Sequence, residues 1–366
     1  EPYNGEGLMN HFRGDGTNYL SVRGDEYKRL TPVYDWMKIP GATIVQLDKM
    51  PGENEIQKWG LTDYVGAVTD GTYGAVGLDF KSPHTGLAAK KAWFFFDKTY
   101  VCLGTNISSR MKNQVLTTVN QCLLNGQVTV SDADGIRPQE RGSRMKKGVR
   151  WVVHDRVGYY FLNKENVILS NQRTEGSWKI ANRQTTTPTD IIQQDVFTLS
   201  VDHGSYPNNE GYAYMVVPSA DPLSIEKQVE EEGVVVLANC PDVQAVRHDG
   251  LNMAYAVFYK GGTLRIHDKI VVEMDAPGML MVKYNDAGEI LALGVSDPTR
   301  FMKKLHLSVN QKIVGSAQEN IQTEWDEKQA LTRITVELPQ NEYAGKSVIY
   351  NNCLLYTSDA ADETPC

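Results

Sequence analysis

The chain has 366 residues, 41% of them hydrophobic, and a formal net charge of −8 at pH 7. This mild acidic excess argues against a general nucleic-acid-binding protein, which needs a clustered basic face. No apolar run approaches the roughly 20 residues that a membrane-spanning helix needs. The five cysteines show no CxxC or Cys/His metal spacing.

Short β-branched and aromatic runs recur through the first 220 residues, bounded by Gly, Pro, Asn and Asp. They predict strands at residues 92–97, 100–104, 127–130, 149–154, 157–162, 195–202 and 212–217. Spacing of this kind is typical of antiparallel β-sandwiches. We therefore predict an all-β fold.

One segment, residues 224–230, has helical character, with Asp221 and Pro222 as a candidate N-cap and first-turn proline. We place the boundary between two domains here, because a length of this order favours two domains. The central β domain is predicted at residues 1–222 and a smaller C-terminal β-sandwich at residues 223–352. The second series of predicted strands covers residues 234–237, 243–246, 254–259, 263–267, 269–274, 278–284, 290–295, 305–309 and 333–338.

Both ends of the sequence are unusual. The chain starts at Glu1 in Gly-rich, polar loop sequence, so we expect it to be the later part of a longer protein. Residues 353–366 reverse-translate into a string that resembles a transposase-type sequencing adapter, so we expect them to be an artefact and not part of the fold. Without its three carboxylates the net charge is −5, and only Cys102, Cys122 and Cys240 remain.

A series of ordered motifs runs through residues 1 to 340. The motifs are Glu1-x-x-Asn4-Gly5-Glu6, Gly14-Asp15-Gly16, Glu26-Tyr27, Asp35-Trp36-x-Lys38-Ile39-Pro40-Gly41, Thr69-Asp70-Gly71, Lys90-Lys91-Ala92-Trp93, Asp202-His203-Gly204 and Ser296-Asp297-Pro298-Thr299. No single motif would suffice, but their number and order are specific. Together they resemble the family 8 polysaccharide lyases, and within them the bacterial chondroitin AC lyases.

The resemblance implies an N-terminal α/α toroid, a large antiparallel β supersandwich of the galactose mutarotase-like type, and a smaller C-terminal antiparallel β-sandwich. We expect the chain to hold the two β parts and to lack the toroid, which carries the catalytic Asn, His, Tyr and Arg in this family. The implied reaction is β-elimination in a uronic acid-containing polysaccharide, such as chondroitin sulfate or hyaluronan. This mechanism requires no metal or redox cofactor.

By position in the motif, Glu1 matches the glutamate that braces the catalytic Tyr/Arg/His group, and Asn4 matches an asparagine in the same cleft. A carboxylate beside an arginine can fix the guanidinium by paired, charge-assisted hydrogen bonds. The alternative is that both are ordinary polar residues near a terminus. Gly7 departs from the family pattern, which often has asparagine there.

Trp59 is a candidate for stacking on a sugar ring, with burial in the sandwich as the alternative. Trp36, the aromatic run at residues 93–96 and His203 are predicted to be structural. Asp15 is predicted to order a glycine-flanked turn. The basic residues Arg137, Arg141, Arg144, Lys146 and Lys147 are predicted to form a solvated charged loop, with attraction of a sulfated chain as the alternative.

Some relatives bind calcium near the Trp-x-Lys-Ile-Pro-Gly segment, using acidic residues on both sides of its tryptophan. Asp35 and Asp48 are the candidate calcium ligands here. Met37 fills the other flanking position, and a thioether is a poor ligand for a hard cation.

A second class of function fits the same sequence. The supersandwich architecture also occurs in mutarotase-like domains, so the chain could be a non-catalytic carbohydrate-binding or scaffolding module. An upstream helical domain with Asn, His, Tyr and Arg at lyase spacing would distinguish the enzyme. The expected partners are an acidic polysaccharide and the toroid of the same protein. An extracellular or periplasmic location is expected from the size of the polymer.

Overall fold

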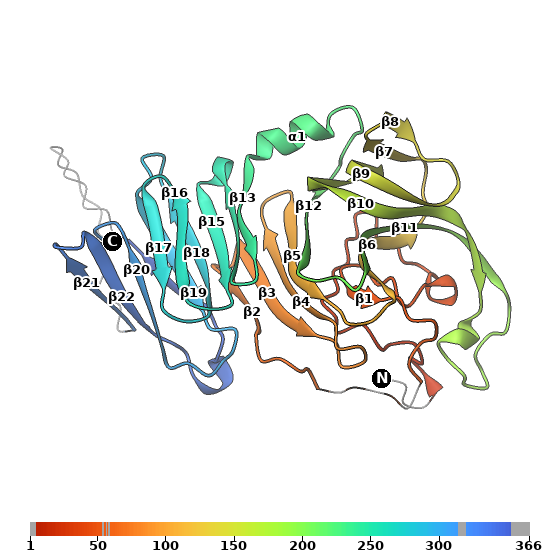
Figure 1. Cartoon of the computed structure of the whole chain (residues 1–366), viewed down its shortest axis with the longest axis horizontal. Helices are drawn as coiled ribbons and strands as arrows, with labels where there is room; N and C mark the ends of the chain where they lie inside the picture. The colour runs from red at the N-terminus through yellow and green to blue at the C-terminus, as the bar shows by residue number, and fades with distance from the viewer. Residues whose placement is uncertain (1–4, 53–54, 56, 58, 314–319, 353–366) are drawn as a thin grey trace.

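The computed structural model describes residues 5–52, 55, 57, 59–313 and 320–352. Antiparallel strands dominate this part and form three sheets, of twelve, six and five strands (Figure 1). One α-helix, α1 (Ile225–Glu232), connects the large sheet to the smaller ones. The predicted all-β fold, with a large antiparallel sheet followed by a smaller β-sandwich, is confirmed. No helix in the described part is long and apolar enough to cross a membrane.

The twelve-stranded sheet runs in the order β1-β6-β11-β10-β12-β5-β4-β3-β2, and β9, β7 and β8 continue from β10. One face of the sheet encloses a core to which strands from both ends of this path contribute, for example Val45 of β1 and Phe80 of β3. The strands are β1 (Thr43–Val45), β2 (Val65–Thr69), β3 (Gly74–Lys81), β4 (Ala88–Phe95), β5 (Tyr100–Ser108), β6 (Gln114–Leu123), β7 (Val128–Asp132), β8 (Gly135–Pro138), β9 (Gly142–His154), β10 (Val157–Gly176), β11 (Ile192–Ser205) and β12 (Glu210–Pro218).

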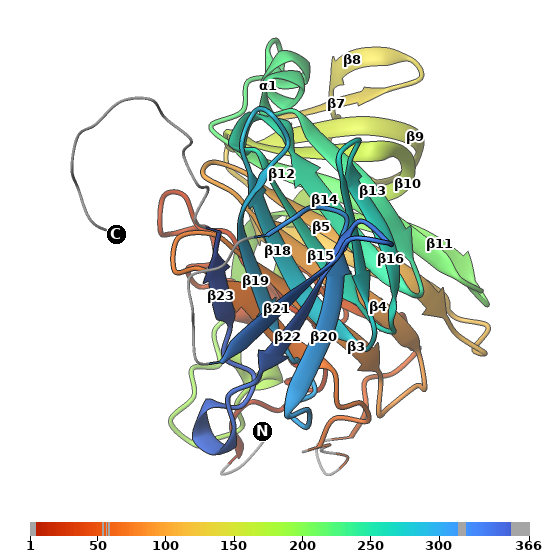
Figure 2. The same cartoon turned by 90° about the vertical axis from the view of Figure 1, so that its left-hand side faces the viewer.

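The two smaller sheets pack face to face as the C-terminal sandwich, which Figure 2 shows from its outer side. Their orders are β13-β14-β15-β18-β19-β23 and β16-β17-β20-β22-β21. The strands are β13 (Val234–Cys240), β14 (Val243–His248), β15 (Met253–Phe258), β16 (Gly262–His267), β17 (Ile270–Met274), β18 (Gly278–Tyr284), β19 (Ile290–Ser296), β20 (Lys304–Val309), β21 (Ile321–Asp326), β22 (Leu331–Glu337) and β23 (Val348–Asn351). Short 3₁₀ helices are η2 (Thr31–Val33), η3 (Trp178–Ile180), η4 (Asp249–Leu251) and η5 (Asn341–Tyr343).

The six-stranded sheet also packs against the back of the large sheet. Tyr64 crosses this contact, since its hydroxyl lies 2.9 Å from the Phe258 carbonyl oxygen. The approach is close at Gly77, where a Cβ would lie 2.5 Å from Cγ1 of Val257. A shared apolar core results, with members Phe94, Leu103, Trp151 and Met215 from the large sheet and Val246, Tyr255, Val257, Met279 and Met281 from the six-stranded sheet.

The structure corrects two details near the helix and the aromatic run. Helix α1 begins at Ile225, and the Asp221 carboxylate accepts from the Leu223 N–H at 2.9 Å, so Asp221 forms a turn before the helix and is not its N-cap. Trp93 and Phe94 are buried as predicted, but Phe95 is 41% exposed. It is the last residue of β4, and its ring stacks on Tyr100.

Candidate functional site

Three connections of the large sheet meet at one end: residues 82–87, 109–113 and 206–209. The strand register brings them together, because Lys81 pairs with Ala88 and Ala88 pairs with Ser108. On the other side, Ser205 pairs with Gln114. Loops on a rigid scaffold commonly carry function, so this end of the sheet is the candidate site.

The first described residues are fixed to a neighbouring segment. The Gly5 carbonyl accepts from the Arg183 N–H at 2.8 Å, and the Leu8 N–H donates to the Ala181 carbonyl at 3.1 Å. Glu6 and Asn182 form a β-bridge between these two bonds. Glu1 and Asn4 lie outside the described residues, but the chain that follows them directly is anchored.

The same N-terminal segment reaches the connection between β3 and β4. The His11 ring meets His84 edge to face, with centroids 5.5 Å apart, and His84 also contacts Phe12. Burial lowers the pKa of both histidines, so both rings are neutral at pH 7. The segment after Asn4 therefore lies beside one of the three connections.

A buried lysine holds two glycine turns together at this site. Lys91 of β4 is fully buried, and its Nζ donates to the carbonyl oxygens of Asp15 at 3.2 Å, Gly16 at 3.1 Å and Gly41. Gly16 and Gly41 have φ of +78° and +83°, a region that favours glycine. The sequence predicted Asp15 as the organiser of its turn, whereas Lys91 supplies these bonds and was not singled out.

Burial also perturbs the ionisation of this pair. It lowers the pKa of Lys91 to about 7, although the nearby Asp15 opposes that change. It raises the pKa of Asp15 to about 8, and Lys91 opposes it. Both shifts favour the neutral forms, as expected for charges removed from water.

A hollow of about 760 Å³ lies among the three connections. Its lining includes Lys81, Arg110, Tyr206 and Asn208. Residues 82–87, 109–113 and 206–209 contain no aspartate or glutamate. The three connections themselves therefore contribute positive and no negative side-chain charge, which favours an anion over a cation.

Most of the basic residues predicted to form a solvated loop lie in strands instead, since only Arg141 falls between β8 and β9. Four of the five are ion-paired. Arg141 binds Asp195 with two parallel bonds at 2.7 and 3.0 Å, and Arg144 lies 2.6 Å from Glu140. Arg137 and Lys146 both approach Asp132. These carboxylates offset the positive charge, so the cluster is a weaker attractor for a sulfated chain than its sequence suggests.

Trp59 is 84% exposed, which excludes the alternative that it packs inside the sandwich. Glu55, four residues before it, is near enough to His11 and His84 to oppose the lowering of their pKa values. Glu55 therefore lies close to the N-terminal segment. Stacking on a sugar ring stays a prediction for Trp59.

Replacing Trp59 with alanine is expected to change the free energy of unfolding by less than about 0.5 kcal/mol, because an exposed side chain buries little surface. Urea unfolding of the two proteins measures this. A loss above about 1 kcal/mol would show that the ring is packed.

The described residues do not fit a calcium site at Asp35. One carboxylate oxygen accepts from Lys38 Nζ at 2.7 Å and the other from the Met37 N–H at 3.1 Å. Asp48 is exposed. Across the described residues, no group of three His, Cys, Asp or Glu side chains could hold a metal ion. Calcium binding through Asp35 and Asp48 stays a prediction without support from this geometry.

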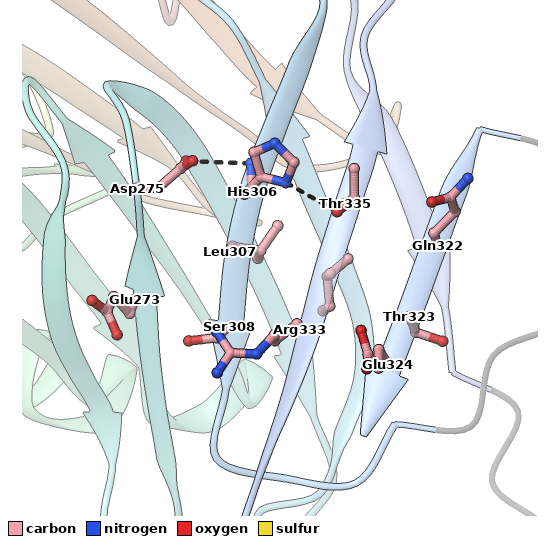
Figure 3. A pocket seen from close by; sticks show the side chains of 11 residues that line it. Glu273, Asp275, His306, Leu307, Ser308, Gln322, Thr323, Glu324, Arg333 and Thr335 are labelled. Atoms are coloured by element: carbon pink, nitrogen blue, oxygen red, sulfur yellow. Dashed lines mark hydrogen bonds between the residues drawn. The ribbon is translucent and has the colours of Figure 1, made fainter. Parts of the chain in front are cut away.

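A second hollow, of about 540 Å³, lies on the outer face of the five-stranded sheet (Figure 3). Some of its polar groups bond one another: His306 Nδ1 lies 2.9 Å from Thr335 Oγ1, and the Asp275 carboxylate accepts from the His306 N–H. Arg333 bonds Asp326 and Gln329. With Glu273 and Glu324 also lining it, this surface does not suit an acidic polymer.

Comparison with known families matches both β parts. The super-sandwich domain of polysaccharide lyase family 8 matches residues 1–229, and the C-terminal β-sandwich domain of the same family matches residues 235–306. The first match alone covers more than half of the chain.

Individual relatives agree. The chain is 35% identical to chondroitinase-AC of Pedobacter heparinus over 353 residues, which is 95% of this chain and 47% of the relative. It is 27% identical to xanthan lyase of Bacillus sp. strain GL1, over 82% of this chain and 33% of the relative. The chain thus spans less than half of their length.

Solved structures give the same result. A chondroitinase AC lyase studied in oligosaccharide complexes superposes with a TM-score of 0.82 and 34% identity, over 94% of this chain and 48% of that one. A Paenibacillus xanthan lyase shares the fold, with a TM-score of 0.84 at 23% identity over 98% of this chain and 35% of that one. The chain therefore belongs to polysaccharide lyase family 8 and comprises its super-sandwich and C-terminal β-sandwich domains.

Proposed function

We propose that the full-length protein is a lyase that cleaves a uronic acid-containing glycosaminoglycan of the chondroitin type by β-elimination, outside the cytoplasm. This chain would form the β side of the substrate cleft. Support comes from relatives that are named as chondroitinase, hyaluronate lyase and xanthan lyase. The chain alone is expected to be inactive, because in this proposal the catalytic Asn, His, Tyr and Arg belong to a preceding toroid.

The chemistry explains this division of labour. A base removes the proton next to the uronate carboxylate, the glycosidic C–O bond breaks, and an acid protonates the leaving oxygen. The proton is weakly acidic, so neutralising the carboxylate lowers the barrier by stabilising the charge that develops beside it. No water is consumed, and one product carries a carbon–carbon double bond.

In this proposal Glu1 is a positioning residue, and Asn4 lies in the same cleft. Glu1 would hold an arginine of the catalytic group by charge-assisted hydrogen bonds. Such placement has to be accurate, because a shift of about 1 Å can cost two orders of magnitude in rate.

One observation carries the proposal on the side of this chain. The segment that directly follows Glu1 and Asn4 is anchored by two backbone hydrogen bonds, and it reaches the end of the sheet where Lys81 and Arg110 line a hollow. Anchoring suits residues that must be held in place, and the cations suit an acidic polymer.

The test joins the chain to its own upstream coding sequence and assays the product on chondroitin sulfate by the ultraviolet absorbance of the unsaturated uronate. Glu1→Ala is expected to lower kcat at least about 30-fold, since the loss of one charge-assisted contact of about 2 kcal/mol corresponds to that factor. Glu6→Ala, on the exposed face of the same segment, is the matched control and should stay within about twofold.

The binding-module alternative predicts a different result. A folded full-length protein that yields no product from chondroitin, hyaluronan or xanthan, yet binds one of them, would replace the lyase proposal. Full activity in Glu1→Ala would retain the proposed lyase activity but would contradict the positioning role of Glu1.

A further inference from the structure

We infer that the hollow among residues 82–87, 109–113 and 206–209 is a binding subsite for an anionic sugar unit, with Lys81 and Arg110 as its charged contacts and Tyr206 as its aromatic platform. The inference deepens the proposed function and rests on it for the substrate class. The subsite uses residues of this chain alone, so its binding can be measured separately from cleavage.

The charge of the hollow is free to act on a ligand. Lys81 and Arg110 are both exposed. Among the described residues, no carboxylate lies within ion-pair distance of either side chain. Arg141, just before β9, is bound to Asp195, and Arg144 on β9 is bound to Glu140 in the same structure. A guanidinium offers paired donors to a carboxylate or sulfate, and an ammonium adds a compact charge.

Tyr206 supplies a ring at the edge of the hollow. It is 59% exposed, and no described ring stacks on it. Its φ of +53° is unusual for a bulky residue, and such strained positions concentrate at functional sites. An exposed aromatic face can cover the apolar C–H face of a sugar while the cations bind the acidic substituent.

The hollow is held in shape before any ligand binds. The Tyr206 N–H donates to the Met111 carbonyl at 3.3 Å, and the Ser109 N–H donates to the Pro207 carbonyl at 3.0 Å. The Asn209 N–H donates to Ser108 Oγ at 3.0 Å. Two connections are thereby locked together, which reduces the entropy lost on binding.

Its place in the fold suits a polymer that continues from the cleavage cleft. The connection between β3 and β4, which contributes Gly86 to the hollow and directly follows Lys81, also carries His84, whose ring contacts His11. His11 lies seven residues after Asn4. A chain leaving the cleft along this side would meet the hollow with its next units.

Isothermal titration calorimetry of the 366-residue chain with a chondroitin 4-sulfate hexasaccharide tests the inference. Lys81→Gln combined with Arg110→Gln is expected to weaken binding at least about tenfold. Tyr206→Asn should weaken it about fivefold, because asparagine tolerates this backbone conformation but lacks the ring. Tyr206→Phe should retain affinity. Arg144→Gln, an exposed arginine already paired to Glu140, is the matched control and should stay within twofold.

Affinity should also fall as salt is raised, and a neutral chito-oligosaccharide of equal length should bind much more weakly. Absence of hexasaccharide binding by the unaltered chain, or equal losses in Arg144→Gln and the double variant, would overturn the subsite. Binding that follows the expected order while the full-length protein shows no cleavage would retain the subsite and remove the lyase proposal. Normal cleavage by the full-length protein without this pattern of binding would retain the lyase proposal and remove the subsite.

Discussion

Replacing Lys91 with methionine is expected to lower the free energy of unfolding by about 3 kcal/mol, because two or more buried carbonyl oxygens lose their donor. Methionine keeps most of the volume and removes the amine that Asp15, Gly16 and Gly41 share. Urea unfolding followed by fluorescence measures the loss. Lys98→Met, at an exposed position in the following turn, is the control and should stay within about 0.5 kcal/mol.

The pH dependence separates Lys91 from a simple packing effect. Its folded pKa of about 7 lies below the unfolded value of 10.5, so the unfolded chain binds more protons between these values. Stability therefore rises with pH across this window, by at most about 1.4 kcal/mol per unit. Between pH 8 and 9.5, above the pKa of Asp15, this rise should be present in the unaltered chain and absent in Lys91→Met. Equal slopes would contradict the assignment.

Acid is expected to destabilise the chain through His154. This ring is 1% exposed, stacks on Phe197 and accepts from the Asn125 N–H at Nε2 at 3.0 Å. Nε2 therefore has no proton, and burial lowers the pKa of His154 to about 4, which Asp155 partly opposes. Because the unfolded value is 6.5, the unfolded chain binds more protons between pH 6.5 and 4. The resulting loss over this interval reaches about 3 kcal/mol.

Urea unfolding at pH 7.5, 5.5 and 4.5 measures this loss. His154→Gln keeps an acceptor for the Asn125 N–H but does not titrate, so its stability should fall less with acid than that of the unaltered chain. Other groups titrate equally in both proteins and cancel in the difference. Identical pH dependence in the two proteins would show that His154 ionises freely after folding.

The strands that the sequence predicted best have runs of apolar and aromatic side chains, as in β12, where residues 212–217 are all buried. β6 was not predicted, because its buried residues include Thr117, Thr118 and Gln121. Their partners come from distant segments: Thr117 bonds Thr43 and His203, and the Gln121 amide bonds the Asp35 and Lys38 carbonyls. An argument from sequence periodicity predicts that polar residues are exposed. Only the folded structure shows that these side chains are buried with their hydrogen bonds made.

The candidate site shows the same limit. The five basic residues within 137–147 are close together in sequence and so were easy to identify as a cluster. In the structure, four of them are paired with carboxylates. Lys81 and Arg110 lie 29 positions apart and meet only through the register of β3, β4 and β5. Family motifs placed Glu1 and Asn4 by analogy, and both lie outside the described residues. The exposure of Trp59 depends on tertiary packing, which sequence pattern does not fix.

The apolar core between the large sheet and the six-stranded sheet bears on how this chain can be divided. The boundaries of family domains mark segments of common ancestry, whereas shared buried surface determines which segments unfold as one cooperative unit. Tyr64, Gly77 and Val257 lie within one continuous layer of contacts. A break in the linker beside α1 would leave each piece with a bare hydrophobic sheet face, prone to self-association. Recombination between members of this family is therefore expected to preserve the two β parts as a single exchangeable block.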